Sequence, residues 1–164
     1  MNRKSALQRL RTFVSGTEGA LFTETLIVVP VVTIFAVGIL EFGNVFWQRS
    51  QVQVGVRDAA RYMARCRAIA PYNTCTQDIA RNLAFYGNPA GTGTPRVPGW
   101  DGVAPDDTSL VELEFFNLPT TAIPTPEIIT VTGRHQYTGS PLFGLLQIDA
   151  FTFTYTHNQR YMGW

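Results

Sequence analysis

The sequence contains few of the residues from which catalytic and metal sites are built. Among its 164 residues there are two cysteines and two histidines. It has no nucleophile elbow, no His-Glu-x-x-His motif, no phosphate-binding loop and no glycine-rich dinucleotide signature. A zinc site of Cys66, Cys75, His135 and His157 can be written down, but zinc ligands normally pair within a few residues, and these histidines are 22 positions apart. We therefore expect a protein that is not an enzyme and that holds no metal or cofactor.

The sequence also lacks an excess of charge of one sign, since its formal net charge is +1 at pH 7. Four of the basic residues and one acidic residue lie in a leader, residues 1–19, so nine basic and eleven acidic side chains remain after it. Binding to nucleic acid phosphates requires clustered positive charge. We therefore expect no nucleic acid partner.

Charged residues are absent from residues 25–40, which are bounded by Glu24 and Glu41. These two carboxylates are 17 positions apart, which corresponds to ~26 Å of helix and is close to the ~30 Å of a bilayer's hydrocarbon core. Trp47 follows where an aromatic residue of the far membrane interface is expected. The pattern predicts a transmembrane helix over residues 20–47, with Glu41 and Trp47 at its outer boundary and lipid around it.

The basic leader predicts the orientation of this helix. Positive charge stays on the cytoplasmic side of a membrane, so residues 1–19 are expected in the cytoplasm and the chain after Trp47 outside it. The alternative is a cleaved secretory signal peptide. That alternative fits less well, because no small-x-small cleavage site follows Leu40 and the apolar run exceeds the usual ~7 to 15 residues of a signal peptide.

Glu24 lies at the expected cytoplasmic end of the apolar segment. An unpaired carboxylate inside hydrocarbon costs at least about 2.5 to 3.5 kcal/mol on insertion scales. An acidic residue in this position therefore indicates a functional site.

The helical pattern continues beyond the membrane, because residues 41–69 contain no proline and apolar residues recur at helical spacing. We expect this stalk to run until Pro71. Arg57, Arg61 and Arg65 repeat along it at every fourth position. Such a stripe is either a solvated face or a surface that docks to acidic surfaces of adjacent subunits.

A second, shorter helix is predicted over residues 77–86. Thr74 and Gln77 have the form of a capping box, and Gly87 is a natural stop. Residues 88–109 are rich in Gly and Pro, so we expect a loop or flexible excursion that does not belong to the core.

The last third of the chain, residues 110–164, changes to a two-residue period. Extended segments are expected around residues 111–115, 129–137 and 151–156, where apolar residues alternate with Glu or Thr. The chain is thus predicted to be α+β, with a long N-terminal transmembrane and stalk helix followed by a small antiparallel β-meander head. The predicted order is a leader (1–19), a membrane helix (20–47), a stalk and short helix (48–87), a loop (88–109) and the head (110–164).

Cys66 and Cys75 both lie outside the membrane in this topology and flank Pro71. The count is even and the compartment is oxidising, so we expect a disulfide that closes a loop of about ten residues and contributes about 2 to 3 kcal/mol. The alternative is two free thiols.

The N-terminal motifs resemble a known family. Residues 18–24 (Glu-Gly-Ala-Leu-Phe-Thr-Glu), residues 38–43 (Gly-Ile-Leu-Glu-Phe-Gly), Trp47 and residues 57–62 (Arg-Asp-Ala-Ala-Arg-Tyr) look like TadE-like proteins, the minor pseudopilins of tight-adherence (Flp) type IV pili. The similarity is densest over residues 18–65.

The resemblance implies cleavage between Gly19 and Ala20 by a prepilin peptidase, which would make Glu24 the fifth residue of the mature protein. It implies a location in the bacterial inner membrane, and the partners that it implies are other pilins or pseudopilins and the inner-membrane assembly platform. The expected function is therefore pilus assembly. The alternative is an uncleaved, signal-anchored extracytoplasmic binding module that is not part of a filament.

Overall fold

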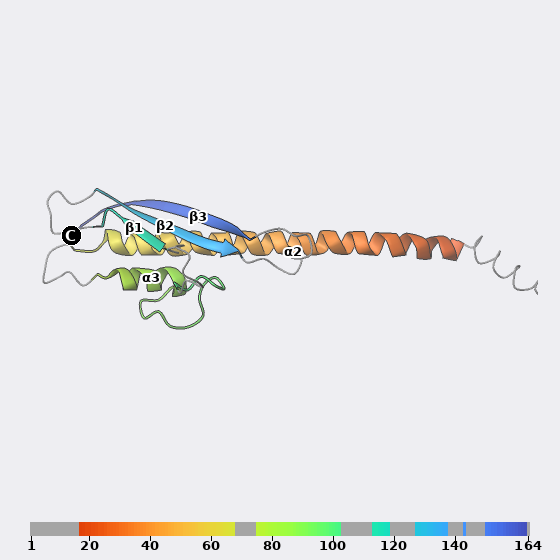
Figure 1. The fold of residues 1–164 in the computed structure, drawn as a ribbon, viewed down its shortest axis with the longest axis horizontal. Helices are drawn as coiled ribbons and strands as arrows, with labels where there is room; N and C mark the ends of the chain where they lie inside the picture. Colours follow the sequence, from red (N-terminus) through yellow and green to blue (C-terminus); the bar gives the residue numbers. More distant parts are fainter. Residues whose placement is uncertain are drawn as a thin grey trace, which may run out of the picture. The chain divides into compact units, whose positions relative to one another are not determined.

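The computed structural model describes residues 17–67, 75–102, 113–118, 127–137, 143 and 150–163. Two helices and three strands follow one another in the order α2 (Thr17–Ala64), α3 (Gln77–Tyr86), β1 (Leu113–Phe116), β2 (Ile128–Tyr137) and β3 (Phe151–Arg160), as Figure 1 shows. The chain divides into two compact units, Met1–Gly43 and Asn44–Trp164. The α+β fold class and the order of a long apolar helix followed by a small antiparallel sheet are confirmed.

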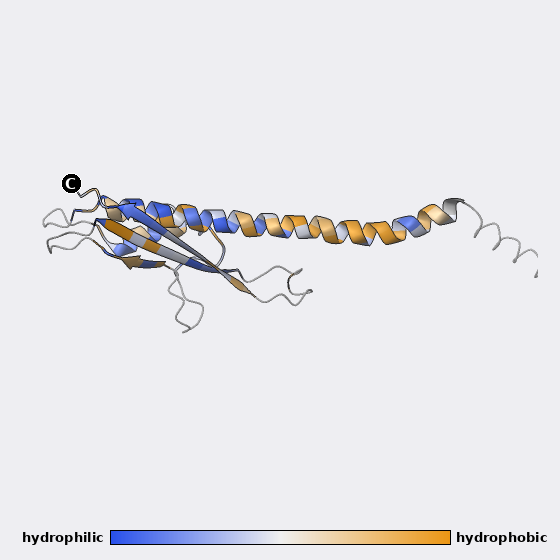
Figure 2. Cartoon of the chain, turned by 90° about the horizontal axis from the view of Figure 1, so that it is seen from above, coloured by the Kyte–Doolittle hydropathy of each residue, from blue (hydrophilic) through white to orange (hydrophobic). Residues whose placement is uncertain are grey.

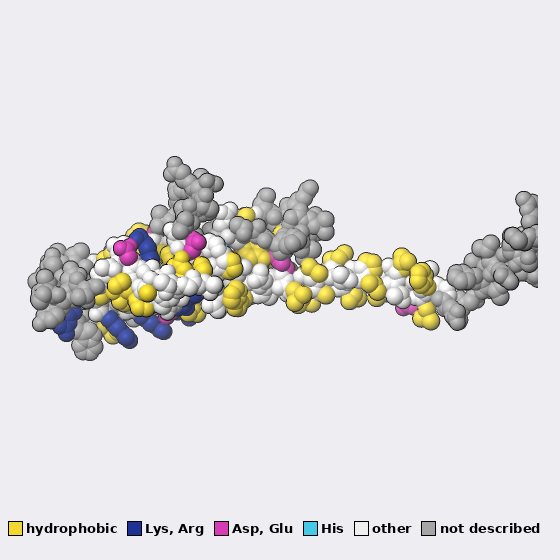
Figure 3. All heavy atoms as spheres, turned by 90° about the horizontal axis from the view of Figure 1, so that it is seen from below, with side chains coloured by type: hydrophobic (Ala, Val, Ile, Leu, Met, Phe, Trp, Pro, Cys, Tyr) yellow, Lys and Arg dark blue, Asp and Glu magenta, His cyan; other side chains and the backbone are white. Residues whose placement is uncertain are grey.

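The first unit contains the apolar part of α2, which Figure 2 shows as a nearly continuous hydrophobic stretch. Its large apolar side chains, from Leu21 to Leu40, are exposed on the helix surface, as Figure 3 also shows. The hydroxyls of Thr25 and Thr33 donate to the carbonyls of Leu21 and Val29 at 2.8 and 2.7 Å, so these polar groups are satisfied within the helix. An apolar surface with satisfied polar groups suits a lipid environment.

In the second unit, one face of α2 packs against the sheet. The buried residues of this face are Val52, Val56, Ala59, Ala60 and Met63. The sheet has the order β1-β2-β3 and is antiparallel throughout. Ile129 and Val131 of β2 and Leu113 of β1 join the helix residues in one hydrophobic cluster. The stalk helix therefore covers the apolar face of the sheet, as an amphipathic sheet requires.

Two glycines allow the elements to approach closely. A Cβ atom on Gly133 of β2 would collide with Cγ2 of Val56, and one on Gly55 of α2 would lie 2.5 Å from the carbonyl oxygen of Ala84 in α3. At both positions the glycine backbone contacts the neighbouring element directly. Any residue with a side chain would force the neighbouring atoms to move.

The helix α2 ends at Ala64, so the prediction that it continues to Pro71 was wrong. Cys66 N–H donates to the Met63 carbonyl at 3.2 Å, which tightens the helix end. Met162 N–H then donates to the Ala64 carbonyl at 3.0 Å, and Tyr161 Oη donates to the Cys66 carbonyl at 2.7 Å. Residues that follow β3 thus satisfy the carbonyls at the helix end.

The short helix α3 has the predicted bounds but a different cap. Its N-cap is Thr76, whose Oγ1 accepts a hydrogen bond from Ile79 N–H at 3.2 Å, rather than Thr74, which lies outside the described residues. Gly87 ends the helix with φ of 73°, as predicted. The predicted disulfide between Cys66 and Cys75 is confirmed and links the end of α2 to the segment before α3.

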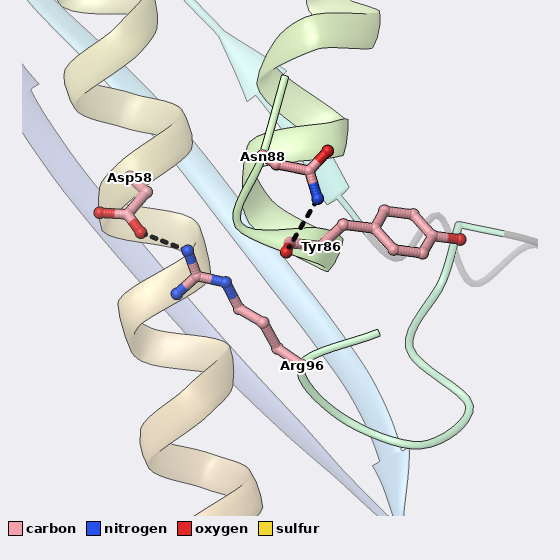
Figure 4. Close-up of polar contacts among 4 residues, drawn as sticks. All are labelled: Asp58, Tyr86, Asn88 and Arg96. Carbon is pink, nitrogen blue, oxygen red and sulfur yellow. Dashed lines mark hydrogen bonds and ion pairs between the residues drawn. The ribbon is translucent and has the colours of Figure 1, made fainter. Parts of the chain in front are cut away.

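The Gly- and Pro-rich segment after α3 contributes to the core, which corrects the expectation that it does not. Val97 and Trp100 are fully buried. Trp100 Nε1 donates to the Arg134 carbonyl at 2.9 Å, and its ring lies edge-on to Phe85 at 4.8 Å. An ion pair of 2.7 Å between Arg96 and Asp58 attaches the segment to α2 (Figure 4). Residues 103–109 of the predicted loop lie outside the described residues.

Candidate membrane and assembly site

The predicted cleavage site lies near the start of α2. Gly19 is partly exposed and Ala20 is exposed, and both are helical. Residues 1–16 of the predicted leader lie outside the described residues. The segment from Gly19 onward belongs to the one helix in the described part of the chain that is long and apolar enough to cross a membrane. Almost none of its apolar window is buried, which indicates a single-pass membrane anchor rather than a core helix.

Glu24 is exposed on the apolar part of α2, within two turns of Gly19. Its neighbours on the helix surface include the exposed side chains of Leu21, Ile27 and Val28. Within the described residues Glu24 makes no ion pair.

The predicted outer boundary residues differ in exposure. Trp47 is 49% exposed, as an interfacial tryptophan requires, whereas Glu41 is 8% exposed and interacts within the protein. Sequence reasoning did not predict the burial of Glu41, because the pattern of charges alone cannot say which face of a helix is covered.

A polar network that sequence reasoning missed begins at the first residue of the second unit. Asn44 Nδ2 donates to Tyr137 Oη at 3.3 Å, and Gln48 Nε2 donates to Asn44 Oδ1 at 3.5 Å. Gln48 Oε1 then lies 3.2 Å from Nε2 of the buried His135. Because the Gln48 amide already donates to Asn44, its oxygen accepts from His135 Nε2–H, which leaves Nδ1 as the unprotonated ring nitrogen.

His135 Nδ1 is the one buried side-chain polar atom in the described part of the chain without a hydrogen-bond partner. Burial lowers the pKa of His135 below its ordinary value of 6.5. The spacing of Asn44 and Gln48 at four positions on the inward face of α2 is the sequence signal that could have indicated this network.

The predicted arginine stripe is exposed, and its three members have different neighbours. Arg57 Nε donates to Tyr155 Oη of β3 at 3.1 Å, with the guanidinium carbon 5.6 Å from the tyrosine ring centroid. Arg61 and Arg65 instead line a hollow beside α3, together with Tyr62 and Leu83. Figure 3 shows a row of basic side chains along one border of the part of the molecule that holds the sheet.

The described residues contain no group of three potential metal ligands. Both sulfurs of the conceivable zinc site, Cys66 and Cys75, are bonded to each other and cannot act as thiolate ligands.

These observations define a membrane-anchored α+β protein with a charged residue in its apolar segment. Comparison with known families adds that residues 19–61 match the family described as TadE-like protein, which confirms the resemblance predicted from the sequence over that segment. The matched segment includes Gly19, Glu24 and Arg57 and ends before the disulfide and the sheet. The match supports a role related to tight-adherence pili. No curated protein and no solved structure matched the chain.

Proposed function

We propose that this protein is a minor pseudopilin that acts, without enzymatic activity, in the assembly of tight-adherence type IV pili. In this proposal it resides in the bacterial inner membrane with its N-terminus in the cytoplasm. A prepilin peptidase cleaves it between Gly19 and Ala20. Its partners are other pilins or pseudopilins and the inner-membrane assembly platform.

The observation that carries the proposal is the position of Glu24, an exposed carboxylate on an exposed apolar helix inside the segment that matches the TadE-like family. After cleavage, the new amine at Ala20 of a neighbouring subunit would be a positive charge that can pair with Glu24. In a low-dielectric environment such a pair is strongly attractive, and it would align subunits in one register.

Replacement of Glu24 tests this role. We expect Glu24→Ala to leave expression and membrane location intact and to abolish piliation, measured by electron microscopy of whole cells. Thr33→Ala is the matched control, because it also removes a polar group from the exposed apolar segment but no charge. Normal pili in the Glu24 variant would refute the proposed role.

Replacement of Gly19 tests the processing step. We expect Gly19→Phe to leave a chain about 2 kDa heavier, because the leader is retained, as measured by intact mass spectrometry. A wild-type chain that begins at Met1 would instead favour the signal-anchored binding module, and a variant heavier than the wild type by only the mass difference between Phe and Gly would show that no cleavage occurs there.

A further inference from the structure

The outer edge of the sheet borders a hollow. Within the described residues β3 pairs with β2 alone, so its other edge has no strand partner. A hollow of about 210 Å³ lies there, lined by Arg49 and Val52 of α2 and by four consecutive β3 residues, Thr152, Phe153, Thr154 and Tyr155. Side chains of consecutive strand residues point to opposite faces of a sheet. Because four consecutive residues of β3 line the hollow, it lies along the edge of the strand and not on one face of the sheet. Backbone groups of an edge can pair with an extended chain.

The helix side of the hollow is positively charged. Arg49 lines it, and Arg57 is held against Tyr155 by its Nε hydrogen bond, which leaves the terminal nitrogens of the Arg57 guanidinium available for a carboxylate. Three other arginines of this unit, Arg81, Arg96 and Arg134, each pair with a carboxylate of the same chain. Arg49 and Arg57 have no such partner in the part of the chain that is described, so an anionic partner would complement them.

A second copy of this chain does not supply that charge from its described residues. In the unit that contains the sheet, Asp58, Asp78 and Glu114 are in ion pairs and Asp101 has an interaction within the chain. Glu127 is exposed, but a single carboxylate does not match two arginines that lie two helical turns apart. Among the residues that the structure describes, the charge therefore favours a different protein over a second copy of this chain as the partner.

Anionic lipid fits less well than a protein. If Trp47 lies at the membrane interface, Arg57 lies ten positions further along the helix, or about 15 Å. The headgroup layer on each side of a bilayer is only about 5 to 8 Å thick. Lipid headgroups could therefore contact Arg49. They could not also extend to Arg57 and the β3 edge.

We propose that the groove between α2 and β3 binds an extended acidic segment of a different protein, which adds to the sheet as a strand beside β3. Backbone hydrogen bonds to the β3 edge supply affinity, and carboxylates on Arg49 and Arg57 select an acidic sequence. This inference rests on the proposed function, because it names the chemistry of the partner that an assembly factor would recruit.

The test uses the full chain in nanodiscs of phosphatidylcholine and a fluorescein-labelled peptide of alternating Glu and Val, with binding followed by fluorescence anisotropy. We expect the peptide to bind and to slow hydrogen exchange of the amides of residues 151–160. Arg57→Gln should weaken binding about tenfold, because a hydrogen bond between charged groups contributes about that factor. Arg81→Gln, which removes an arginine of α3 outside the groove, should leave binding unchanged.

Two peptide controls separate strand addition from attraction between charges. A peptide with Lys in place of Glu should not bind, and a peptide with N-methylated backbone amides should bind much more weakly. Equal binding of the N-methylated peptide, or an unchanged affinity of the Arg57→Gln protein, would overturn the inference. It would also be overturned if phosphatidylglycerol nanodiscs slowed exchange at residues 151–160 without peptide.

This assay does not require pili, so its result is separable from the Glu24 test. Failure of the peptide to bind removes the groove as a docking site and leaves the role of Glu24 untouched. Normal piliation of the Glu24→Ala variant removes the assembly role and leaves a measured affinity of the groove in place.

Discussion

At the scale of single residues, the second unit contains a polar contact where an apolar one would be expected. Asn44, Gln48, His135 and Tyr137 form a chain of hydrogen bonds between α2 and β2, next to the aromatic ring of Phe153. A buried polar network is stabilising only when its members are satisfied. His135 Nδ1 is the member that is not.

This network predicts a pH dependence of stability. The pKa of His135 is lowered in the folded state, so as pH falls below about 6.5 the unfolded chain takes up a proton that the folded protein does not. The unfolded state then binds more protons, and the free energy of unfolding should decrease. We expect the melting temperature of the wild type to fall over this range and that of His135→Gln to change much less. Retention of the full pH dependence in His135→Gln would contradict this assignment.

Glu24 illustrates how far residue types alone can predict a site. The charge is conspicuous because no other charged residue follows until Glu41, so an unusual carboxylate could be recognised without any structure. The groove residues could not be recognised in this way. Arg49 and Thr154 are ordinary surface residues in the sequence, and only the packing of a strand about a hundred positions later against α2 brings them to one hollow.

At the scale of elements, the contact between α2 and α3 depends on a residue without a side chain. Gly55 faces the Ala84 carbonyl, and the Trp100 ring carbons would lie 2.9 Å from a Cβ atom at that position. Two helices approach this closely only where one of them lacks a side chain.

Gly55→Ala should therefore destabilise the protein. Overpacking of a tight contact costs typically about 1 to 3 kcal/mol, and we expect a loss of this size in urea denaturation of the full chain in detergent. Gly43→Ala is the matched control in the same helix, because nothing lies within 4 Å of its added Cβ. The control should be neutral or slightly stabilising, since alanine favours a helix. Equal effects of the two substitutions would show that helix propensity, and not the α2–α3 contact, governs the result.

The strands were more predictable than the helix ends. Phe151, Phe153 and Tyr155 alternate with threonines, and in β3 the aromatic side chains are half-buried while the threonines are exposed, as the two-residue period predicts. The end of α2 was missed because it depends on Tyr161 and Met162, which are nearly a hundred positions away. Trp100 was missed because its segment has the composition of a loop, although its indole N–H finds a partner in β2.

At the scale of the whole molecule, the two units differ in what stabilises them. The described part of the first, residues 17–43, is helix with exposed apolar side chains, which requires a surrounding apolar medium. The second has a hydrophobic cluster of its own and a disulfide that joins the segments before and after residues 67–74. Its stability can therefore be measured separately from membrane insertion.

Removal of the disulfide should lower that stability. Closing a loop of about ten residues contributes about 2 to 3 kcal/mol by restricting the unfolded chain. We expect the Cys66→Ala, Cys75→Ala double variant to lose that amount in urea denaturation relative to the oxidised wild type. A reducing agent should shift the wild type in the same direction and leave the double variant unchanged. A shift of the double variant by the reductant would mean that the agent acts elsewhere.

The closure of the α2 end by Tyr161 and Met162 has a consequence for the timing of biogenesis. In the proposed topology the chain after Trp47 is exported, and the Tyr161 hydroxyl bonds to the Cys66 carbonyl 95 positions earlier, so this contact beside the end of α2 forms only after the polypeptide between the two residues has crossed the membrane. Translocation of the whole intervening stretch must come first. A chain that remains unfolded until this point stays accessible to chaperones and disulfide-forming enzymes, which suits the pairing of Cys66 with Cys75.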